Sequence, residues 1–526
     1  MRVFFRLCLL LLVFTFVNPN DTLAKRILYV PMDNRPVCLD YTLDTLKSAG
    51  WEIVIPPRSL IASRDNMGNP DGLMDWLERE AASADAAVVS TDALLYGGLV
   101  SSRTHSFDEN TLMRRFDRLT SLKSKQLDLR IYAFSTIMRT PRASSGGVEP
   151  PYYEKWGPNI FRWSELQDKS EIVGLDDSEN KEKSDLLAKI PQDVLDDWLT
   201  RREKNFNINK ELVYSMEKNS FDYFVMGKDD TAPYSQSHKE SRLLENEIEN
   251  RGLGNYLLEN YLMFVGADQL GLILLTKAVN DQTLNVPFVY VEYARGTGPR
   301  TIPTYEDVQV GNTIKSHIYA AGGFPAKSKD RADLILFVNT PFDGVTKEAA
   351  SPENTYIASK YTKNFVGRVK KELNSKNQVP VSIADIEYGN GASNALVSSL
   401  MKERIAYRLE SYAGWNTASN TIGYALSQGI LGKNMTKENK HRLMTIRYLD
   451  EWAYQANVRG QLYSDIVWPL NLNGVRLGKN EGMLEKAAYE RIHKVVGRYI
   501  PATYLQGLSV NFPWDRLFEI EITLKK

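Results

Sequence analysis

The densest group of reactive side chains in this 526-residue sequence follows a short apolar run at residues 221–226. The run predicts a buried strand, and the adjacent carboxylates Asp229 and Asp230 come shortly after it. In such a pair one carboxylate can orient a group while the other acts as a general acid with a raised pKa. We therefore predict catalytic roles for both. The simpler alternative is that one caps the next helix and the other pairs with Lys228.

Polar side chains also follow other apolar runs, and we predict that they share one cleft with the acid pair. The carboxyl ends of parallel strands meet at one edge of a sheet, where ligands bind in α/β proteins. Each acid taken alone could instead be a helix N-cap. The substrate-binding side chains predicted on this ground are Asp33, Asn34, Arg35, Asp92, Tyr96, Arg103, His238, Asp268, Asp385, Glu387 and Asn390.

A second cluster combines aromatic rings with amides. It comprises Tyr412, Trp415, Asn416 and Asn420. Ring faces stack on sugars and amides bind hydroxyl groups, so we add these residues to the predicted substrate-binding set. The alternative is that Trp415 belongs to the core and Asn416 begins a helix.

Several other chemistries have no signature in the sequence. All five histidines are isolated, and no H-E-x-x-H or H-x-H motif occurs, which argues against a zinc site. No G-x-S-x-G and no P-loop is present. We therefore predict no metal ligands and no cofactor. A calcium or magnesium ion held by carboxylates is the lesser alternative.

Apolar runs that alternate with helical segments predict an α/β fold with parallel sheets. A strand, a helix, a glycine and a second strand within residues 26–55 favour two doubly wound lobes over a decorated (β/α) barrel. We place the first lobe at residues 25–283 with an insertion at 143–219, the second lobe at 284–432, and a mainly helical region at 433–526. Within these, residues 193–205 and 210–218 are predicted as two helices and residues 405–409 as a strand.

The N-terminus has the pattern of a signal peptide at residues 1–24. A basic start with Arg2 and Arg6 precedes an apolar run at residues 7–17 and a small-residue cleavage site at Ala24. We therefore expect export, with an uncleaved anchor as the alternative and no membrane span after cleavage. Cleavage would leave Cys38 as the one cysteine, so no internal disulfide is expected.

The charges of the chain narrow the range of partners. Lys+Arg and Asp+Glu are balanced at 65 each, so the formal net charge is zero and nothing favours nucleic acid. The expected partner is a small molecule or a glycan. The sequence does not predict an oligomeric state.

Several long phrases resemble those of the bacterial family DUF4127, and together they extend over nearly all of the chain after the signal peptide. The phrases are YVPMDNRPV, STDALLYGGLVSSR, KDDTAPYSQSHKE, GADQLG, ADIEYGNGAS and YAGWNTASNTIG. A family of unknown function implies no activity, so the resemblance assigns no role to any residue.

Acids and aromatic residues at strand ends in an exported, neutral α/β chain predict a hydrolase that acts on carbohydrate, most specifically a glycoside hydrolase. One alternative is a non-catalytic, two-lobed protein that binds a small ligand such as a sugar. Another is a hydrolase that depends on a metal held by carboxylates.

Overall fold

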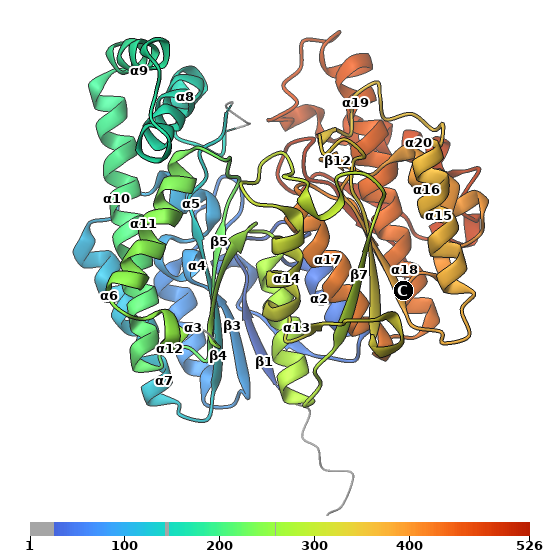
Figure 1. Ribbon diagram of the computed structural model, residues 1–526, viewed down its shortest axis with the longest axis horizontal. Helices are drawn as coiled ribbons and strands as arrows, with labels where there is room; N and C mark the ends of the chain where they lie inside the picture. The colour runs from blue at the N-terminus through green and yellow to red at the C-terminus, as the bar shows by residue number, and fades with distance from the viewer. Residues whose placement is uncertain (1–25, 143–146, 258, 526) are drawn as a thin grey trace, which may run out of the picture.

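The computed structural model of the protein describes residues 26–142, 147–257 and 259–525 (Figure 1). The predicted signal peptide at residues 1–24 lies outside these residues. Two parallel sheets stand side by side, each with helices against it, and the C-terminal region lies against the second sheet (Figure 1). The prediction of two doubly wound lobes is therefore confirmed, and the barrel alternative is wrong.

The first sheet has six parallel strands in the order β2-β1-β3-β4-β5-β6. The strands are β1 (Ile27–Val30), β2 (Ile53–Val54), β3 (Ala86–Ser90), β4 (Arg130–Ile137), β5 (Tyr223–Lys228) and β6 (Tyr261–Val265). Every residue of β1, β3 and β5 is buried, which explains why these runs are apolar without alternation. The helices of this lobe are α2 (Asp40–Ser48), α3 (Pro70–Ala81), α4 (Thr91–Tyr96), α5 (Leu99–Thr104), α6 (Glu109–Thr120), α7 (Leu122–Lys125), α11 (Gln236–Asn250), α12 (Gly254–Leu257) and α13 (Leu270–Gln282).

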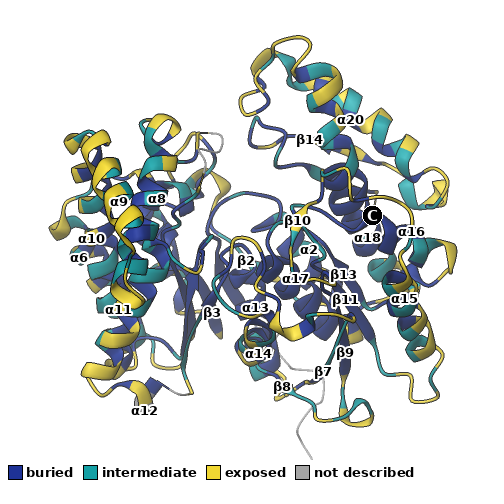
Figure 2. Cartoon of the chain, turned by 45° about the horizontal axis from the view of Figure 1, so that its top comes forward, coloured by how far each residue is buried: buried dark blue, intermediate teal, exposed yellow. Residues whose placement is uncertain are grey.

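The predicted insertion lies between β4 and β5 and forms three helices. They are α8 (Tyr153–Ile172), α9 (Asp177–Lys189) and α10 (Gln192–Ser215). A small separate core around Trp163 and Trp198 holds them together, and α9 has no buried residue (Figure 2). The prediction of two helices in the α10 segment is wrong. Asn205 and Asn209 do not interrupt the helix, because their buried amides donate to the carbonyl oxygens of Ser102 and Thr136.

The second sheet has five parallel strands in the order β13-β11-β9-β7-β8. Counted along the chain, this is the order of the first five strands of the other sheet. The strands are β7 (Phe288–Tyr293), β8 (Phe324–Pro325), β9 (Leu334–Asn339), β11 (Val381–Asp385) and β13 (Ser411–Ala413), with β10 (Lys347–Glu348) and β12 (Tyr388–Gly389) as a separate parallel pair. The helices are α14 (Val310–Ala320), α15 (Lys360–Leu373), α16 (Asn394–Lys402) and α17 (Ala418–Leu431).

The predicted strand at residues 405–409 is wrong. Ala406–Arg408 form a 3₁₀ turn, and the strand β13 begins only at Ser411. The Tyr407 ring leaves the sheet and packs edge-on against Tyr448 and Tyr504 of the C-terminal region. The apolar run at residues 405–409 therefore contributes to the packing against the C-terminal region and does not form a strand.

The C-terminal region begins with a long helix that contains two π-helical stretches. Its parts are α18 (Lys437–Arg447), the π-helix η7 (Tyr448–Val458), α19 (Arg459–Leu462), the π-helix η8 (Tyr463–Val467), α20 (Glu481–Val496), and the antiparallel strands β14 (Ser509–Asn511) and β15 (Glu521–Thr523). The last segment returns to the first lobe, where the Ile522 N–H donates to the Tyr41 hydroxyl over 2.9 Å. None of the described helices combines the length and apolar character that a membrane crossing requires.

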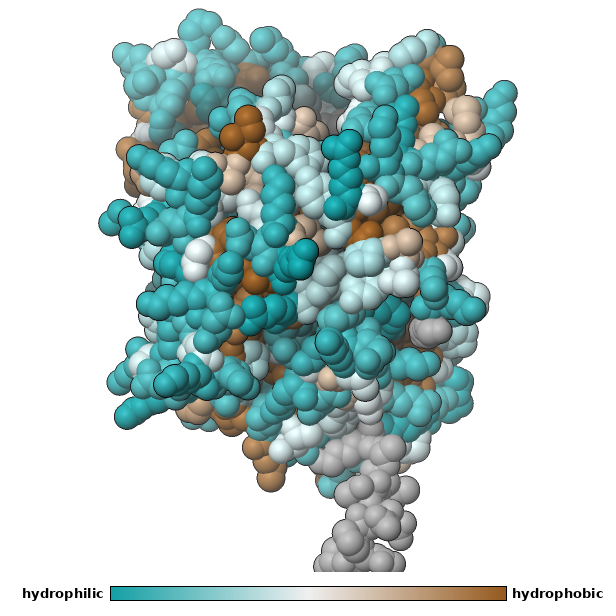
Figure 3. Space-filling model, turned by 90° about the vertical axis from the view of Figure 1, so that its right-hand side faces the viewer, coloured by the Kyte–Doolittle hydropathy of each residue, from teal (hydrophilic) through white to brown (hydrophobic). Residues whose placement is uncertain are grey.

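The two lobes share one core. Helix α13 packs against β3 and β4 of the first sheet and against α17, which covers the second sheet. At Gly271 a Cβ atom would come within 2.2 Å of the Tyr29 hydroxyl, so the helix lies very close to β1. Figure 2 shows the dark, buried residues continuing from one sheet to the other. The face seen in Figure 3 is mostly hydrophilic, with its apolar residues in separate groups.

Candidate active site between the two lobes

A cleft of about 850 Å³ lies where both lobes and the C-terminal region meet. It is reached by the carboxyl ends of several strands: Asp229 follows β5, Asp268 follows β6, and Asn416 follows β13. The insertion supplies Phe161, and the C-terminal region supplies Trp514. This is the place where parallel α/β folds bind ligands.

The adjacent acids are held by a ring of alternating charges. The Arg103 Nη2 atom donates to Asp229 over 2.6 Å, and the Arg139 Nη1 atom donates to Asp230 over 2.9 Å. Glu149 bridges the two arginines, because one of its oxygens accepts from Arg103 over 3.2 Å and from Arg139 over 2.7 Å. Three carboxylates thus share two guanidinium groups, which leaves one negative charge in excess.

Asp230 carries the signs of a functional residue. Burial and the neighbouring charge of Asp229 raise its pKa to about 6, against the opposing effect of Arg139. Its backbone has a φ of +25°, a conformation that non-glycine residues rarely adopt. Tyr305, Asn390 and Asn416, which also line the cleft, have positive φ as well. Backbone strain is therefore concentrated around this cleft.

A second charged network connects the lobes beneath the cleft. Arg35 binds Asp33 over 2.9 Å and Asp268 over 2.6 Å. The other oxygen of Asp268 accepts from the amides of Asn416 at 3.2 Å and Asn420 at 3.3 Å, so a residue after β6 joins the start of α17. Burial raises the pKa of Asp268, while Arg35 opposes the rise.

Glu306 is a further carboxylate in the cleft. One of its oxygens accepts from both the N–H and the hydroxyl of Ser419 at 2.6 Å, and the other has no partner among the described residues. Burial raises the pKa of Glu306 to about 7. The Thr231 N–H donates to the Tyr305 carbonyl over 2.9 Å, so one backbone hydrogen bond ties the segments that carry Asp230 and Glu306.

Cations lie over two of the aromatic rings of the cleft, Trp514 and Phe161. The Arg35 and Arg516 guanidinium groups lie 5.3 and 5.2 Å from the centre of the Trp514 ring. Arg142 lies 5.0 Å from the Phe161 ring and has no ion pair with the described residues. These contacts fit cation–π geometry, so stacking on a sugar ring would compete with them.

The structure brings many of the predicted site residues together. Those that line the cleft are Arg35, Arg103, Asp229, Asp230, Asp268, Asn390, Asn416 and Asn420. Two more lie directly behind them: Asp33 binds Arg35, and the side-chain amide oxygen of Asn34 accepts from the Trp514 indole over 2.7 Å.

The other predicted site residues do not line the cleft, because the fold uses them elsewhere. They are Asp92, Tyr96, His238, Asp385, Glu387, Tyr412 and Trp415. Asp385 accepts from the Ser393 N–H and the Tyr412 hydroxyl inside the second lobe. His238 pairs with Asp168 on α8 over 2.6 Å.

The remaining members of this group are also bound within their own lobe, where all but the half-buried Glu387 are buried. Asp92 is buried below the cleft, where it accepts from the Thr136 hydroxyl over 3.0 Å. Trp415 is buried against Tyr424 and Phe518. Glu387 accepts from the Asn339 amide. Residues that follow a strand thus divide between the cleft and the interior of their own lobe.

Sequence reasoning missed several residues of the site. They are Glu149, Tyr305, Glu306, Trp514 and Arg516. Arg139 follows β4, and its pairing with Glu149 and Asp230 is the simpler role for an arginine at a strand end near acids. Glu149, Glu306 and Trp514 lie in irregular segments with no pattern that would single them out.

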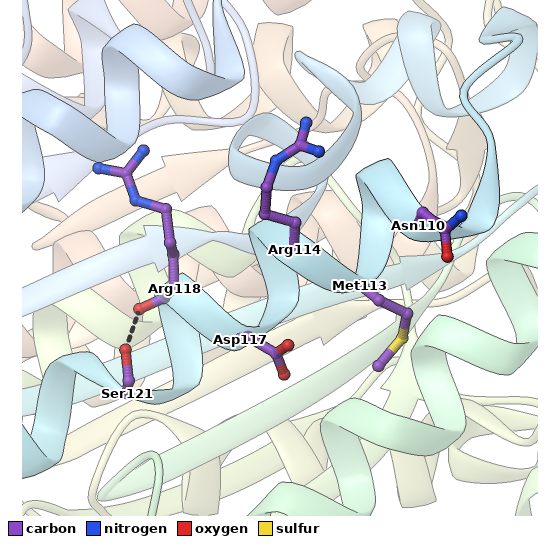
Figure 4. A pocket seen from close by; sticks show the side chains of 6 residues that line it. All are labelled: Asn110, Met113, Arg114, Asp117, Arg118 and Ser121. Atoms are coloured by element: carbon purple, nitrogen blue, oxygen red, sulfur yellow. Dashed lines mark hydrogen bonds between the residues drawn. The ribbon is translucent and has the colours of Figure 1, made fainter.

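A second hollow, of about 560 Å³, lies on the outer side of α6 (Figure 4). In its lining, Arg118 binds Glu78 over 2.6 Å, and the Ser121 hydroxyl donates to the Arg118 carbonyl. We assign it no chemistry.

Among the described residues, no group of three or more His, Cys, Asp or Glu side chains is arranged to hold a metal ion. Comparison with curated proteins found no match. Comparison with protein families found a match over residues 27–523, which is nearly the whole chain. The chain therefore belongs to DUF4127, a family described as protein of unknown function.

Proposed function

We propose that the protein is an exported hydrolase that acts on carbohydrate, most specifically a glycoside hydrolase. The observation that carries the proposal is the Asp229–Asp230 pair in the cleft between the lobes. Arg103 binds Asp229, while the raised pKa of Asp230, about 6, keeps a large share of it protonated up to mildly acidic pH. A protonated acid beside an ionised one is the arrangement that acid-catalysed glycoside cleavage requires.

In the proposed reaction Asp230 donates its proton to the glycosidic oxygen as the bond from that oxygen to the anomeric carbon breaks. Water then adds to the anomeric carbon, and the proton that it releases returns to the acid pair. Asp229, fixed by Arg103, stabilises the positive charge that develops on the sugar ring. The buried donors around the pair orient the hydroxyl groups of the substrate.

A screen of chromogenic glycosides and cell-wall fragments tests the proposal. We expect turnover by the wild type and, on the natural linkages of the cell-wall fragments, a loss of about 10²–10⁴-fold in Asp230→Asn, the usual contribution of a general acid. Activity that is unchanged in both Asp229→Asn and Asp230→Asn would refute the proposed roles. Export is tested separately, by determining the N-terminal residue of protein recovered outside the cytoplasm.

The alternative of a non-catalytic protein that closes two lobes around a sugar receives less support. Relative motion of domains is expected where their interface is small and polar, and here α13 and α17 join the lobes through a continuous apolar core. Sugar-dependent thermal stabilisation without turnover would favour this alternative.

A further inference from the structure

One carboxylate in the cleft lacks a cationic partner. Asp229, Asp230 and Asp268 each bind an arginine, whereas Glu306 accepts hydrogen bonds only from Ser419 among the described residues. The nearest lysine is also occupied, because Lys228 binds Asp307 over 2.7 Å. The negative charge of Glu306 therefore has no compensating ion pair.

Two acceptor oxygens at this corner of the cleft have no hydrogen-bond partner among the described residues. They are Oε2 of Glu306 and Oδ1 of Asn420, on side chains that are 2% and 3% exposed. The Asn420 Nδ2 atom donates to Asp268, which fixes the orientation of the amide. Buried acceptors without partners are costly and uncommon, so two in one cleft indicate a missing donor.

The first turn of α17 does not supply an anion site at this corner. The Ser419 N–H is taken by Glu306, and the Asn420 N–H is taken by the hydroxyl of Thr417. A helix N-terminus usually favours a negative group, and here Glu306 already fills that position. What the corner still offers to a ligand is acceptors and negative charge.

We propose that the corner formed by Glu306 and Asn420 binds a primary ammonium group, so that the substrate is a carbohydrate with a free amino group. The sugar part of this inference rests on the function proposed above. An ammonium group has three N–H donors and a positive charge, which satisfies both acceptors and neutralises Glu306. A hydroxyl group would leave the charge uncompensated, and an acetamido group offers one donor and no charge.

The pKa of Glu306 is consistent with this binding mode. Burial raises it to about 7, and a bound ammonium group would lower it again. Amine binding near neutral pH should therefore release a proton from Glu306. The release is measurable as a dependence of the binding enthalpy on the ionisation enthalpy of the buffer.

The test compares disaccharides that differ only at one substituent, namely 2-amino, 2-acetamido and 2-hydroxy forms in gluco and galacto configuration. Calorimetry near neutral pH should show the amino form of at least one series binding about 10-fold or more tightly than its two counterparts. Glu306→Gln should abolish most of this preference. The matched control Glu387→Gln removes a carboxylate of the same lobe outside the cleft and should retain it.

Similar affinity for all three substituents, or no binding of the amino sugars, overturns the inference. If Glu306→Gln fails to fold, Asn420→Ala removes the second acceptor and should weaken binding of the amino form selectively. Amino sugars that bind but are never hydrolysed would support the ammonium site and refute the proposed hydrolase. Neutral sugars that are hydrolysed and bind as tightly as the amino sugars would support the proposed hydrolase and refute the ammonium site.

Discussion

The shared charges of the acid pair define the chemistry available to each residue. Arg103 and Arg139 neutralise two of the three carboxylates around them, and burial beside Asp229 raises the pKa of Asp230. Glu149 thus affects Asp230 indirectly, because it occupies both guanidinium groups. It is a positioning residue, and its role can be separated from a purely structural one by a pH profile.

We expect Glu149→Gln to lower the pKa of Asp230, since Arg139 would then neutralise Asp230 alone. A general acid is lost as the pH rises through its pKa, so the alkaline limb of the pH–rate profile should move to lower pH. Carboxyl carbon NMR of Asp230 would measure the same shift without substrate. A profile that keeps its position while the rate falls uniformly would indicate a structural role only.

Asp92 gives a stability prediction. Burial raises its pKa to about 7, so the folded protein retains a proton that the unfolded chain releases above about pH 4. Stability contributed by this group therefore falls as the pH rises from about 4 to about 7. Asp92→Asn mimics the protonated form, and it should raise the free energy of unfolding at pH 8 by roughly 1–4 kcal/mol, with little effect at pH 4.

Urea unfolding at the two pH values measures this difference, with Asp330→Asn at an exposed position as the control. An equal effect of Asp92→Asn at both pH values would show that Asp92 is ionised in the folded protein.

How far the sequence predicted the site depends on where each residue lies. Asp229, Asp268 and Arg35 follow buried apolar runs, and the parallel topology brings such ends together. Asp385 follows an equivalent run, yet its oxygens are taken up by neighbours in its own lobe. Glu149 and Glu306 reach the cleft on loops, whose paths depend on long-range packing that no local pattern encodes.

At the scale of elements, the turn between α4 and α5 carries Arg103 into the cleft. Gly97 ends α4 with a φ of +97°, and Gly98 follows with a φ of +139°. A Cβ atom at Gly98 would lie 2.5 Å from the Cβ of Ala62. The segment that approaches the backbone so closely at this point is another part of the same lobe.

Gly98→Ala should therefore cost at least about 2 kcal/mol of stability, since it combines backbone strain with a collision. Gly252→Ala is the matched control, because Gly252 has a φ of +70° but nothing within 4 Å of its added Cβ. That variant should lose only about 1 kcal/mol. Thermal or urea unfolding of both variants separates the cost of backbone strain from the cost of the collision. Equal losses of stability would show that the collision at Gly98 is relieved.

Strands and helices were predicted well where burial within a single sheet or helix layer determines which residues are apolar. The buried runs of β1, β3 and β5 were identifiable because both faces of each strand are covered. The short strand β13 and the continuous helix α10 could not be identified in this way. Contacts with other layers determine where β13 begins and why α10 is not interrupted.

At the scale of the whole molecule, the apolar core continues through α13 from one lobe to the other. Two doubly wound units could have been joined by a flexible hinge. The buried helix instead joins them through one continuous apolar core.

The shared core predicts a single unfolding transition. Leu274→Ala in α13 should cost about 2–5 kcal/mol, because the side chain is fully buried, and it should destabilise both lobes equally. Leu284→Ala, at a position that is 91% exposed, should change stability by less than about 0.5 kcal/mol. Hydrogen exchange of β3 and β9 peptides at increasing denaturant measures the two lobes separately, and protection lost at different concentrations would contradict the shared core.

The role of Asp230 as the general acid is tested most directly by how the rate depends on the leaving group. Kinetics of Asp230→Asn should be compared on aryl glycosides with a good leaving group and on natural linkages with a poor one. We predict little loss on the activated substrate, which needs no proton, and about 10²–10⁴-fold loss on the natural linkage. Equal losses on both substrates, or none on either, would contradict the proposed acid in the cleft.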